Sequence, residues 1–141
     1  MELALEEAKK ALSEGEVPVG AVLVKGDEVI AKGHNTRERE NDISGHAEIV
    51  AMKEGAKKLG RWSLEECTLY VTLEPCLMCA GAIMQSRIRS LVYGADDPKV
   101  GAITSKYHVF DHQDSGILIY GGERAKECKA LLDAFFAQQR N

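Results

Sequence analysis

The chain is predicted to fold as an α/β domain in which helices cover both faces of a mixed β-sheet. Segments with helical spacing of apolar residues alternate with strand-like segments, as in layered α/β folds. The first two strand-like segments are joined by a tight turn, so they pair antiparallel and the sheet is not purely parallel. The 141 residues, 45% of them hydrophobic, are enough for one buried core. Residues 1–141 are therefore expected to form a single domain.

The first predicted elements are a helix and a β-hairpin. Apolar residues recur at helical spacing ahead of Gly15, which is placed to end the helix. An apolar strand over 17–24, a turn over 25–28 and a partner strand over 29–31 form the hairpin. A polar loop, from about residue 34 to residue 45, follows it.

Three more strands and three more helices complete the prediction. Pro75 is expected to open one of these helices, because proline is well tolerated at the first helical position. The predicted order is a helix over 46–59, a strand over 67–72, the helix opened by Pro75, strands over 90–93 and 116–120, and a last helix over 123–138. The sheet would then have five strands within three α/β/α layers.

Composition excludes several classes of protein. The chain has no apolar run near the ~20 residues that a membrane helix needs. Its N-terminus lacks the apolar stretch and cleavage site of a signal peptide, so the expected location is the cytoplasm. Four cysteines in a reducing compartment suggest thiols or metal ligands. With 18 basic and 22 acidic residues, the net charge of −4 argues against a protein that simply coats nucleic acid.

Three residues form a candidate metal site: His46, and about 30 residues later Cys76 and Cys79. Cysteines three positions apart on a helix place both sulfurs on one face. Two thiolates and one imidazole suit Zn²⁺, and three protein ligands leave a fourth position for water, as in catalytic zinc sites. Both ligand groups lie at predicted helix starts, where the positive potential favours thiolate over thiol.

Glu48 is the candidate proton carrier for this site. It lies two residues after His46 and so does not share its helix face, but it could reach a metal-bound water as general base and then general acid. Two other interpretations of the cysteine pair are a redox pair and a closed structural zinc site with Cys67 as fourth ligand. An open site explains Glu48, and the closed site does not.

The order H-x-E followed by P-C-x-x-C is a signature of zinc nucleobase deaminases. The chain resembles the cytidine-deaminase superfamily, and specifically the bacterial tRNA wobble adenosine deaminases. The resemblance covers most of residues 1–100 and the final helix. The similar segments are 16–22, 33–35, 46–49, 68–83, 86–88, 93–99 and 127–136.

The resemblance implies a cytidine-deaminase-like fold, a homodimer, and hydrolytic deamination of adenosine to inosine at the wobble position of a tRNA anticodon stem-loop. It implies one zinc ion per chain held by His46, Cys76 and Cys79, with Glu48 moving protons. It further implies that Asn35 contacts the flipped nucleoside. The remaining implied substrate contacts are the backbone at Ala47 and near Glu74 and Pro75, and Asp97 beside the substrate strand.

Two departures from the family keep a second function open. Residues 102–122 fit the family pattern poorly, and a basic C-terminal tail is missing. RNA affinity comes largely from Lys and Arg contacts to phosphate, for which Arg37, Lys99, Lys106, Arg87 and Arg89 are candidates. The alternative is a salvage deaminase of a free nucleobase or nucleoside. A remote alternative is a non-catalytic, zinc-stabilised RNA-binding module, against which the presence of Glu48 counts.

Overall fold

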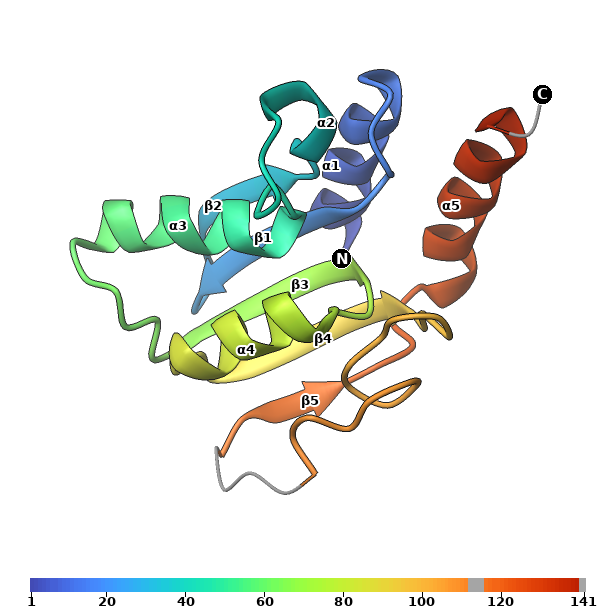
Figure 1. The fold of residues 1–141 in the computed structure, drawn as a ribbon. Helices are drawn as coiled ribbons and strands as arrows, with labels where there is room; N and C mark the ends of the chain where they lie inside the picture. Colours follow the sequence, from blue (N-terminus) through green and yellow to red (C-terminus); the bar gives the residue numbers. More distant parts are fainter. Residues whose placement is uncertain (112–115, 140–141) are drawn as a thin grey trace.

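The computed structural model describes residues 1–111 and 116–139, and within them five strands form one mixed sheet in the order β2-β1-β3-β4-β5 (Figure 1). β1 pairs antiparallel with β2 and β3, and β3, β4 and β5 are parallel to one another. The elements are α1 (Glu2–Ser13), β1 (Gly20–Lys25), β2 (Glu28–His34), α2 (Arg37–Glu40), α3 (Ala47–Leu59), β3 (Cys67–Leu73), α4 (Leu77–Gln85), β4 (Ser90–Ala95), β5 (Leu118–Tyr120) and α5 (Ala125–Gln139).

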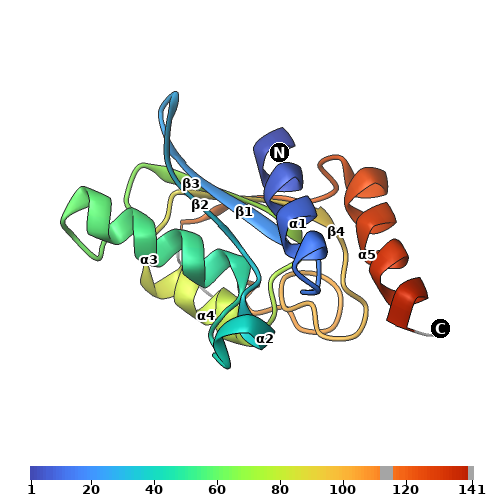
Figure 2. The ribbon, with the colours of Figure 1, turned by 90° about the horizontal axis from the view of Figure 1, so that it is seen from above.

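Helices form a layer on each side of the sheet, as predicted. α3 and α4 lie on one face, and α1 and α5 lie on the other (Figures 1 and 2). Two glycines set how closely the first helices approach. A Cβ on Gly20 would lie 2.0 Å from the Ala4 carbonyl oxygen of α1, and one on Gly33 would lie 2.9 Å from the Ala47 carbonyl oxygen of α3. Backbone therefore packs directly on backbone on both faces.

Strand register brings four chain segments to one edge of the sheet. Gly20 at the start of β1 pairs with His34 at the end of β2, and Leu73 at the end of β3 pairs with Ala95 at the end of β4. Ligands of α/β sheets commonly bind outside the carboxyl ends of parallel strands. The segments that leave this edge carry every predicted site residue, whereas the tight turn between β1 and β2 lies at the opposite edge.

The structure corrects the prediction that Pro75 opens a helix. α4 begins at Leu77, and Cys76 before it is extended, with φ −79° and ψ 179°. The Pro75 carbonyl instead accepts a hydrogen bond of 2.8 Å from the Ala102 N–H. Proline's fixed φ suits a loop that joins a strand to a helix as well as it suits the first turn.

Several other boundaries differ from the prediction, and β2 in particular extends to His34 rather than ending at residue 31. β1 begins at Gly20 rather than residue 17, since Pro18 has no N–H to donate to a neighbouring strand. The predicted polar loop contains the one-turn helix α2, whose four residues lack a buried face that a pattern could reveal. Positions 112–115 of the divergent segment, and residues 140–141, lie outside the described residues.

The remaining elements appear where the periodicity predicts them. Cys67 and Cys128 are buried, as expected of small apolar side chains. Phe135 is buried and packs edge-to-face with the more exposed Phe136, at 5.3 Å between ring centroids. None of the helices described is both long and apolar enough to cross a bilayer.

Candidate active site

The candidate metal ligands meet at the edge of the sheet where β3 ends. The Nδ1 atom of His46 lies 3.7 Å from the Cys76 sulfur and 3.4 Å from the Cys79 sulfur. All three ligand atoms lie within 4.8 Å of one another. They are the only such group of three among the residues that the structure describes, and Cys67 is not part of it. The closed site with Cys67 as fourth ligand is therefore absent from this part of the chain.

These separations fit a tetrahedral zinc ion. Bond lengths of about 2.3 Å to sulfur and about 2.0 Å to nitrogen require the nitrogen and each sulfur to lie about 3.5 Å apart. The measured distances, 3.4 and 3.7 Å, lie on either side of this value without any rearrangement. The donor set of two sulfurs and one imidazole also suits zinc better than the hard cations, which prefer oxygen.

Helix starts position two of these ligands, as predicted. His46 is the N-cap residue of α3 and Cys76 is the N-cap residue of α4, and neither side chain caps its own helix. The Cys76 side chain accepts hydrogen bonds from the Cys79 thiol and from His46, and these lower the pKa of Cys76 to about 3. The same interaction with Cys76, together with burial, raises the pKa of Cys79. The pKa values of the two cysteines are therefore shifted in opposite directions, and Cys76 is the one whose thiolate form is favoured.

Glu48 lies in the first turn of α3 with only 4% of its surface exposed. It lines the same cavity as His46 and Cys76. Burial raises the pKa of Glu48 to about 7. A carboxyl group that gains and loses a proton near neutrality is suited to general acid–base work.

A cavity of about 140 Å³ adjoins the metal ligands. Its lining joins the segments that leave the sheet edge. The lining residues are Val17, Val19, Asn35, Arg37, His46, Glu48, Leu73, Glu74, Cys76, Asp97 and Val100.

Asn35 lies in this lining and organises the start of α3. Its Oδ1 atom accepts a hydrogen bond of 3.0 Å from the Ala47 N–H. Asn35, rather than the N-cap residue His46, therefore caps α3, so the His46 imidazole is available to a metal. Because the Ala47 N–H is engaged by Asn35, a base edge that meets Ala47 would have to share this hydrogen bond.

Glu74 and Asp97 also line the cavity, but the Glu74 carboxylate is directed into the protein. It is 2% exposed and accepts hydrogen bonds from the backbone of Asp97 and of residues 103–105. These bonds outweigh the effect of burial, which acts to raise its pKa, so the pKa of Glu74 lies below its ordinary value. The carboxylate is therefore not available to a ligand, and the Glu74 N–H is also engaged, since it donates to the Ala95 carbonyl at 2.9 Å.

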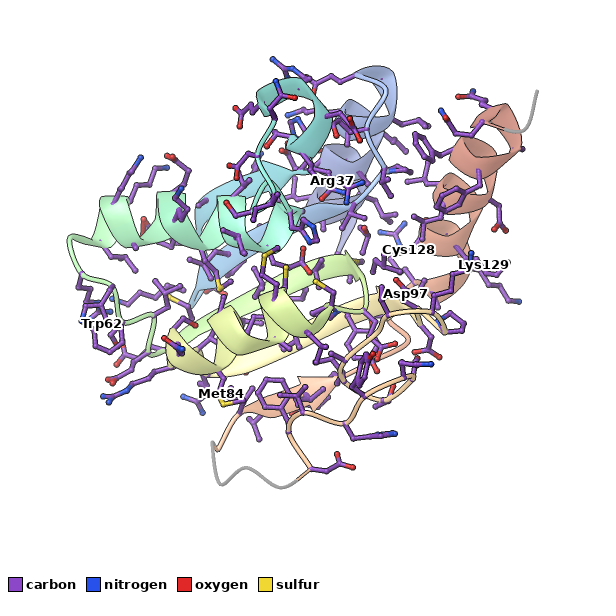
Figure 3. The ribbon with its side chains drawn as sticks, in the orientation of Figure 1. Arg37, Trp62, Met84, Asp97, Cys128 and Lys129 are labelled. Carbon is purple, nitrogen blue, oxygen red and sulfur yellow. The ribbon has the colours of Figure 1, made fainter. Side chains whose placement is uncertain are left out.

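The candidate basic residues do not form one cluster. Arg37 lines the cavity, whereas the Arg87 guanidinium lies 5.4 Å from the Trp62 ring centroid in a separate groove. Figure 3 shows Arg37 and Trp62 in different regions of the molecule. Sequence patterns also missed Val17, Val19 and Val100 as cavity residues, since isolated valines near strand ends carry no distinguishing signal.

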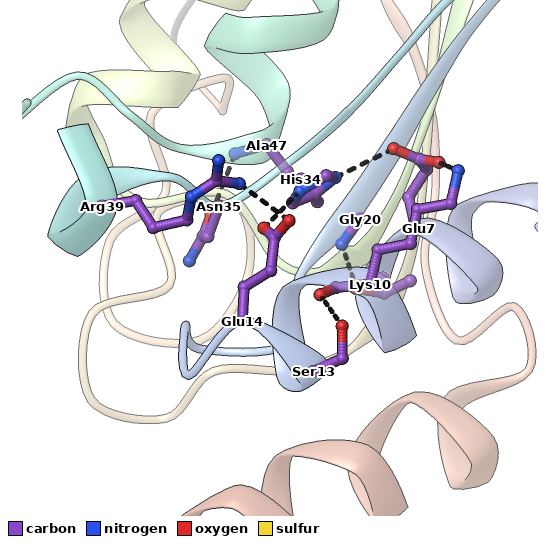
Figure 4. A network of polar contacts seen from close by, with 10 residues as sticks. Glu7, Lys10, Ser13, Glu14, Gly20, His34, Asn35, Arg39 and Ala47 are labelled. Atoms are coloured by element: carbon purple, nitrogen blue, oxygen red, sulfur yellow. Dashed lines mark hydrogen bonds and ion pairs between the residues drawn. The ribbon is translucent and has the colours of Figure 1, made fainter.

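A chain of polar contacts lies beside Asn35 and links α1 to the end of β2 (Figure 4). His34, predicted as a loop histidine, ends β2, and its Nδ1 and Nε2 atoms lie 3.0 Å from Glu7 and 2.9 Å from Glu14. Lys10 extends the chain from Glu7 at 2.7 Å, and Arg39 extends it from Glu14 at 2.7 Å. These contacts fix α1 against the end of β2, one residue before Asn35.

Comparison with known proteins identifies the family. The sequence matches the MafB19-like deaminases over residues 1–140. The chain belongs to this deaminase family. The tRNA-specific adenosine deaminase of Bacillus subtilis is 47% identical over 99% of this chain and 88% of its own length. That of Haemophilus influenzae is 48% identical over 99% of this chain and 83% of its own length.

Solved structures of deaminases have the same fold. A tRNA:A34 deaminase, studied for A-to-I editing at the wobble position, superposes with a TM-score of 0.89 at 45% identity and covers 94% of this chain and 97% of its own. A guanine deaminase from Nitrosomonas europaea superposes with a TM-score of 0.86 at 26% identity, over 96% of this chain and 82% of its own. The resemblance to the cytidine-deaminase superfamily, the fold class and the deaminase activity are thereby confirmed.

Proposed function

We propose that this deaminase converts adenosine to inosine at the wobble position of a tRNA anticodon stem-loop and releases ammonia. The observation that carries the proposal is one cavity that is lined by two of three suitably spaced candidate metal ligands and by a buried carboxyl group. Relatives named tRNA-specific adenosine deaminases match nearly the whole chain at 47–48% identity. These similarities support the tRNA substrate more strongly than the 26% identity of the guanine deaminase supports a free base.

One Zn²⁺ ion per chain would be held by His46, Cys76 and Cys79. When bound, zinc supplies a water molecule that is activated as a nucleophile at neutral pH. Glu48 would take one proton from the attacking water and give it to a ring nitrogen of adenine. It would then take the remaining proton of the added hydroxyl group and give it to the amino group, which leaves as ammonia. A carbon–oxygen bond forms at the amino-bearing ring carbon, and the carbon–nitrogen bond breaks.

The cavity residues would position the base for this reaction. Asn35 is expected to contact the nucleoside through its amide nitrogen, since its oxygen is bound to Ala47. The backbone of Ala47, Glu74 and Pro75 is expected to face the base edge, and Asp97 to lie beside the substrate strand. Val17 and Val100 supply apolar surface for the faces of a ring.

Two carboxyl variants on one helix test the role of Glu48. Glu48→Gln should lose nearly all ammonia release from a stem-loop with a wobble adenosine, and it should keep its zinc. The matched variant Glu54→Gln changes an exposed carboxylate of α3 and should keep the wild-type rate. Cytosine, guanine, adenosine and cytidine are assayed in parallel. Turnover of one of these with an untouched stem-loop would replace the tRNA proposal by the salvage alternative.

Metal analysis tests the ligand set separately. Cys79→Ala should lose zinc, whereas Cys67→Ala should retain one ion per chain, because Cys67 lies outside the group of ligand atoms. Loss of zinc from Cys67→Ala would contradict this ligand set.

We also propose that the chain forms a homodimer in the cytoplasm, as its resemblance implies. A groove of about 740 Å³ between α3 and α4 offers an apolar surface. Trp62 in this groove is 64% exposed, which is unusual for so large an apolar side chain. Trp62→Glu should convert a dimer into a monomer in sedimentation experiments, and a wild-type monomer would contradict the proposal. The apolar groove residues are Ile49, Met52, Ala56, Trp62, Leu64, Ala82 and Met84.

A further inference from the structure

Glu74 connects the metal ligands to the segment of chain after β4. It directly follows β3 and lies two residues before Cys76. Its carboxylate points away from solvent, and the residue is 2% exposed. A buried carboxylate at such a position must be satisfied by hydrogen bonds within the protein.

Five donors converge on this carboxylate. Its Oε2 atom accepts the N–H groups of Ile103, Thr104 and Ser105 at 3.0, 2.8 and 3.0 Å. Its Oε1 atom accepts the Asp97 N–H at 3.0 Å and the Ser105 hydroxyl. A carboxylate offers about four lone-pair positions, so these donors saturate it. Glu74 therefore has no acceptor left to offer a substrate.

The segment that Glu74 holds is folded tightly around it. A Cβ on Gly101 would lie 2.4 Å from the Glu74 Cδ atom, so only glycine allows this approach. The Ala102 N–H bonds the Pro75 carbonyl at 2.8 Å, and the Gly101 N–H bonds the Asp97 carbonyl at 2.8 Å. Residues 97–105 thus wrap around one side chain.

This segment supplies one wall of the base cavity. Asp97 and Val100, which both line the cavity, lie within it. The Asp97 side chain in turn accepts the N–H groups of Lys99 and Val100, at 3.1 and 3.3 Å. The position of the wall therefore depends on bonds that end at the Glu74 carboxylate.

We propose that Glu74 is a positioning residue, whose carboxylate fixes residues 97–105 as a wall of the base cavity and so sets how the substrate base is held. The substrate named here rests on the proposed function, whereas the positioning of the segment does not. Glu74 acts through Asp97 and Val100 and does not touch the reacting atoms.

Glu74→Gln tests the proposal with a nearly isosteric change. The amide keeps one oxygen to accept from residues 103–105, but its NH₂ group faces the Asp97 N–H, and two donors then oppose each other. KM for the stem-loop should rise about tenfold with a much smaller change in kcat, because binding geometry is lost and proton transfer is not. Hydrogen exchange at the Asp97 amide should also accelerate, because this N–H loses its acceptor.

Metal readouts separate this effect from damage to the ligands. Zinc content, and the visible spectrum of the cobalt-substituted protein, should match the wild type in Glu74→Gln. Loss of zinc, an altered cobalt spectrum, or a fall in kcat with unchanged KM would overturn the proposal. If Glu74→Gln does not fold, Ser105→Ala tests the proposal instead. This variant removes one hydroxyl donor from the Glu74 Oε1 atom and should also raise KM. An unchanged KM in a folded Ser105→Ala protein would then overturn it.

The outcomes also distinguish this proposal from the proposed function. A wild-type protein that leaves the stem-loop untouched refutes the tRNA substrate, and KM is then measured on the free base or nucleoside that it deaminates. Unchanged exchange at the Asp97 amide in Glu74→Gln refutes the positioning role, whatever the substrate.

Discussion

Replacement of Gly33 by alanine should disturb the metal site through the helix that carries it. A methyl group at Gly33 would lie 2.8 Å from the Ala51 nitrogen, 2.9 Å from the Ala47 carbonyl oxygen and 2.9 Å from a Val50 methyl group. The first two atoms belong to the backbone of α3, so no side-chain rotation can relieve the contact. The helix must move away from β2 by about 0.6 Å to restore ordinary contact.

This movement affects both the packing of α3 against β2 and the geometry of the metal site, so stability and zinc affinity should both fall. Forcing an extra methyl group into a packed layer costs about 1–3 kcal/mol of unfolding free energy. Metal sites tolerate ligand distances only within about 0.2 Å of their ideal values, and His46 is the N-cap residue of the displaced helix. Zinc affinity should therefore fall as well, by about tenfold or more.

Gly81→Ala is the matched control for this variant. Gly81 lies in α4, close in sequence to Cys79, and a Cβ there would meet no atom within 4 Å. Alanine is favoured over glycine in a helix by up to about 1 kcal/mol, so this variant should be as stable as the wild type or more stable.

Guanidinium unfolding of the zinc-loaded proteins measures the stability difference, and competition with a chromophoric chelator measures zinc affinity. Equal stability of the two variants would refute the packing argument. A destabilised Gly33→Ala protein with unchanged zinc affinity would refute the claim that the strand contact positions the ligand.

Charged groups and the metal lead to three further expectations. Burial acts to raise the pKa of Glu7, but Lys10 and His34 outweigh it and hold the pKa below its ordinary value. The stabilisation that ionised Glu7 contributes is complete above the pKa that Glu7 has in the unfolded chain. It is lost as the pH falls through the lower pKa that Glu7 has in the folded protein. Between about pH 6 and about pH 3, Glu7→Gln should thus lose less unfolding free energy than the wild type, and an equal loss would count against this assignment. Arg37→Ala should weaken stem-loop binding and reduce the slope of log binding constant against log salt concentration by about one. Arg39→Ala should do neither, because the Arg39 guanidinium is already paired with Glu14. Equal effects of the two variants would argue against Arg37 as a phosphate contact. Chelation should abolish deamination and added zinc should restore it, while activity in fully metal-free protein would exclude the proposed site.

The helices, the strands and the grouping of the three candidate metal ligands could be predicted because each leaves a local pattern in the sequence. Alternating periodicities define the layers, and the hairpin turn makes one pair of strands antiparallel. Histidine and a C-x-x-C pair keep their spacing whether or not Pro75 lies in the helix. Their placement at helix starts is confirmed, because His46 and Cys76 are both N-cap residues.

Contacts between distant segments could not be predicted in this way. The pairing of Glu74 with residues 103–105 spans about thirty positions and depends on how a loop turns after β4. Asn35 resembles any turn residue in the sequence, and only the structure shows that it caps α3 at Ala47. Arg37 and Arg39 are equivalent by composition, but one lines the cavity and the other is held by Glu14.

The turn between β1 and β2 has a practical consequence for anyone who wishes to attach another protein to this one. Register places the turn at the edge of the sheet opposite the ligands, and Gly26 within it has a positive φ of 61° and open space around it. Loop tips of this kind tolerate insertion well. A tag or fused domain inserted there would project away from the cavity mouth, so a long nucleic acid could approach the opposite edge without obstruction.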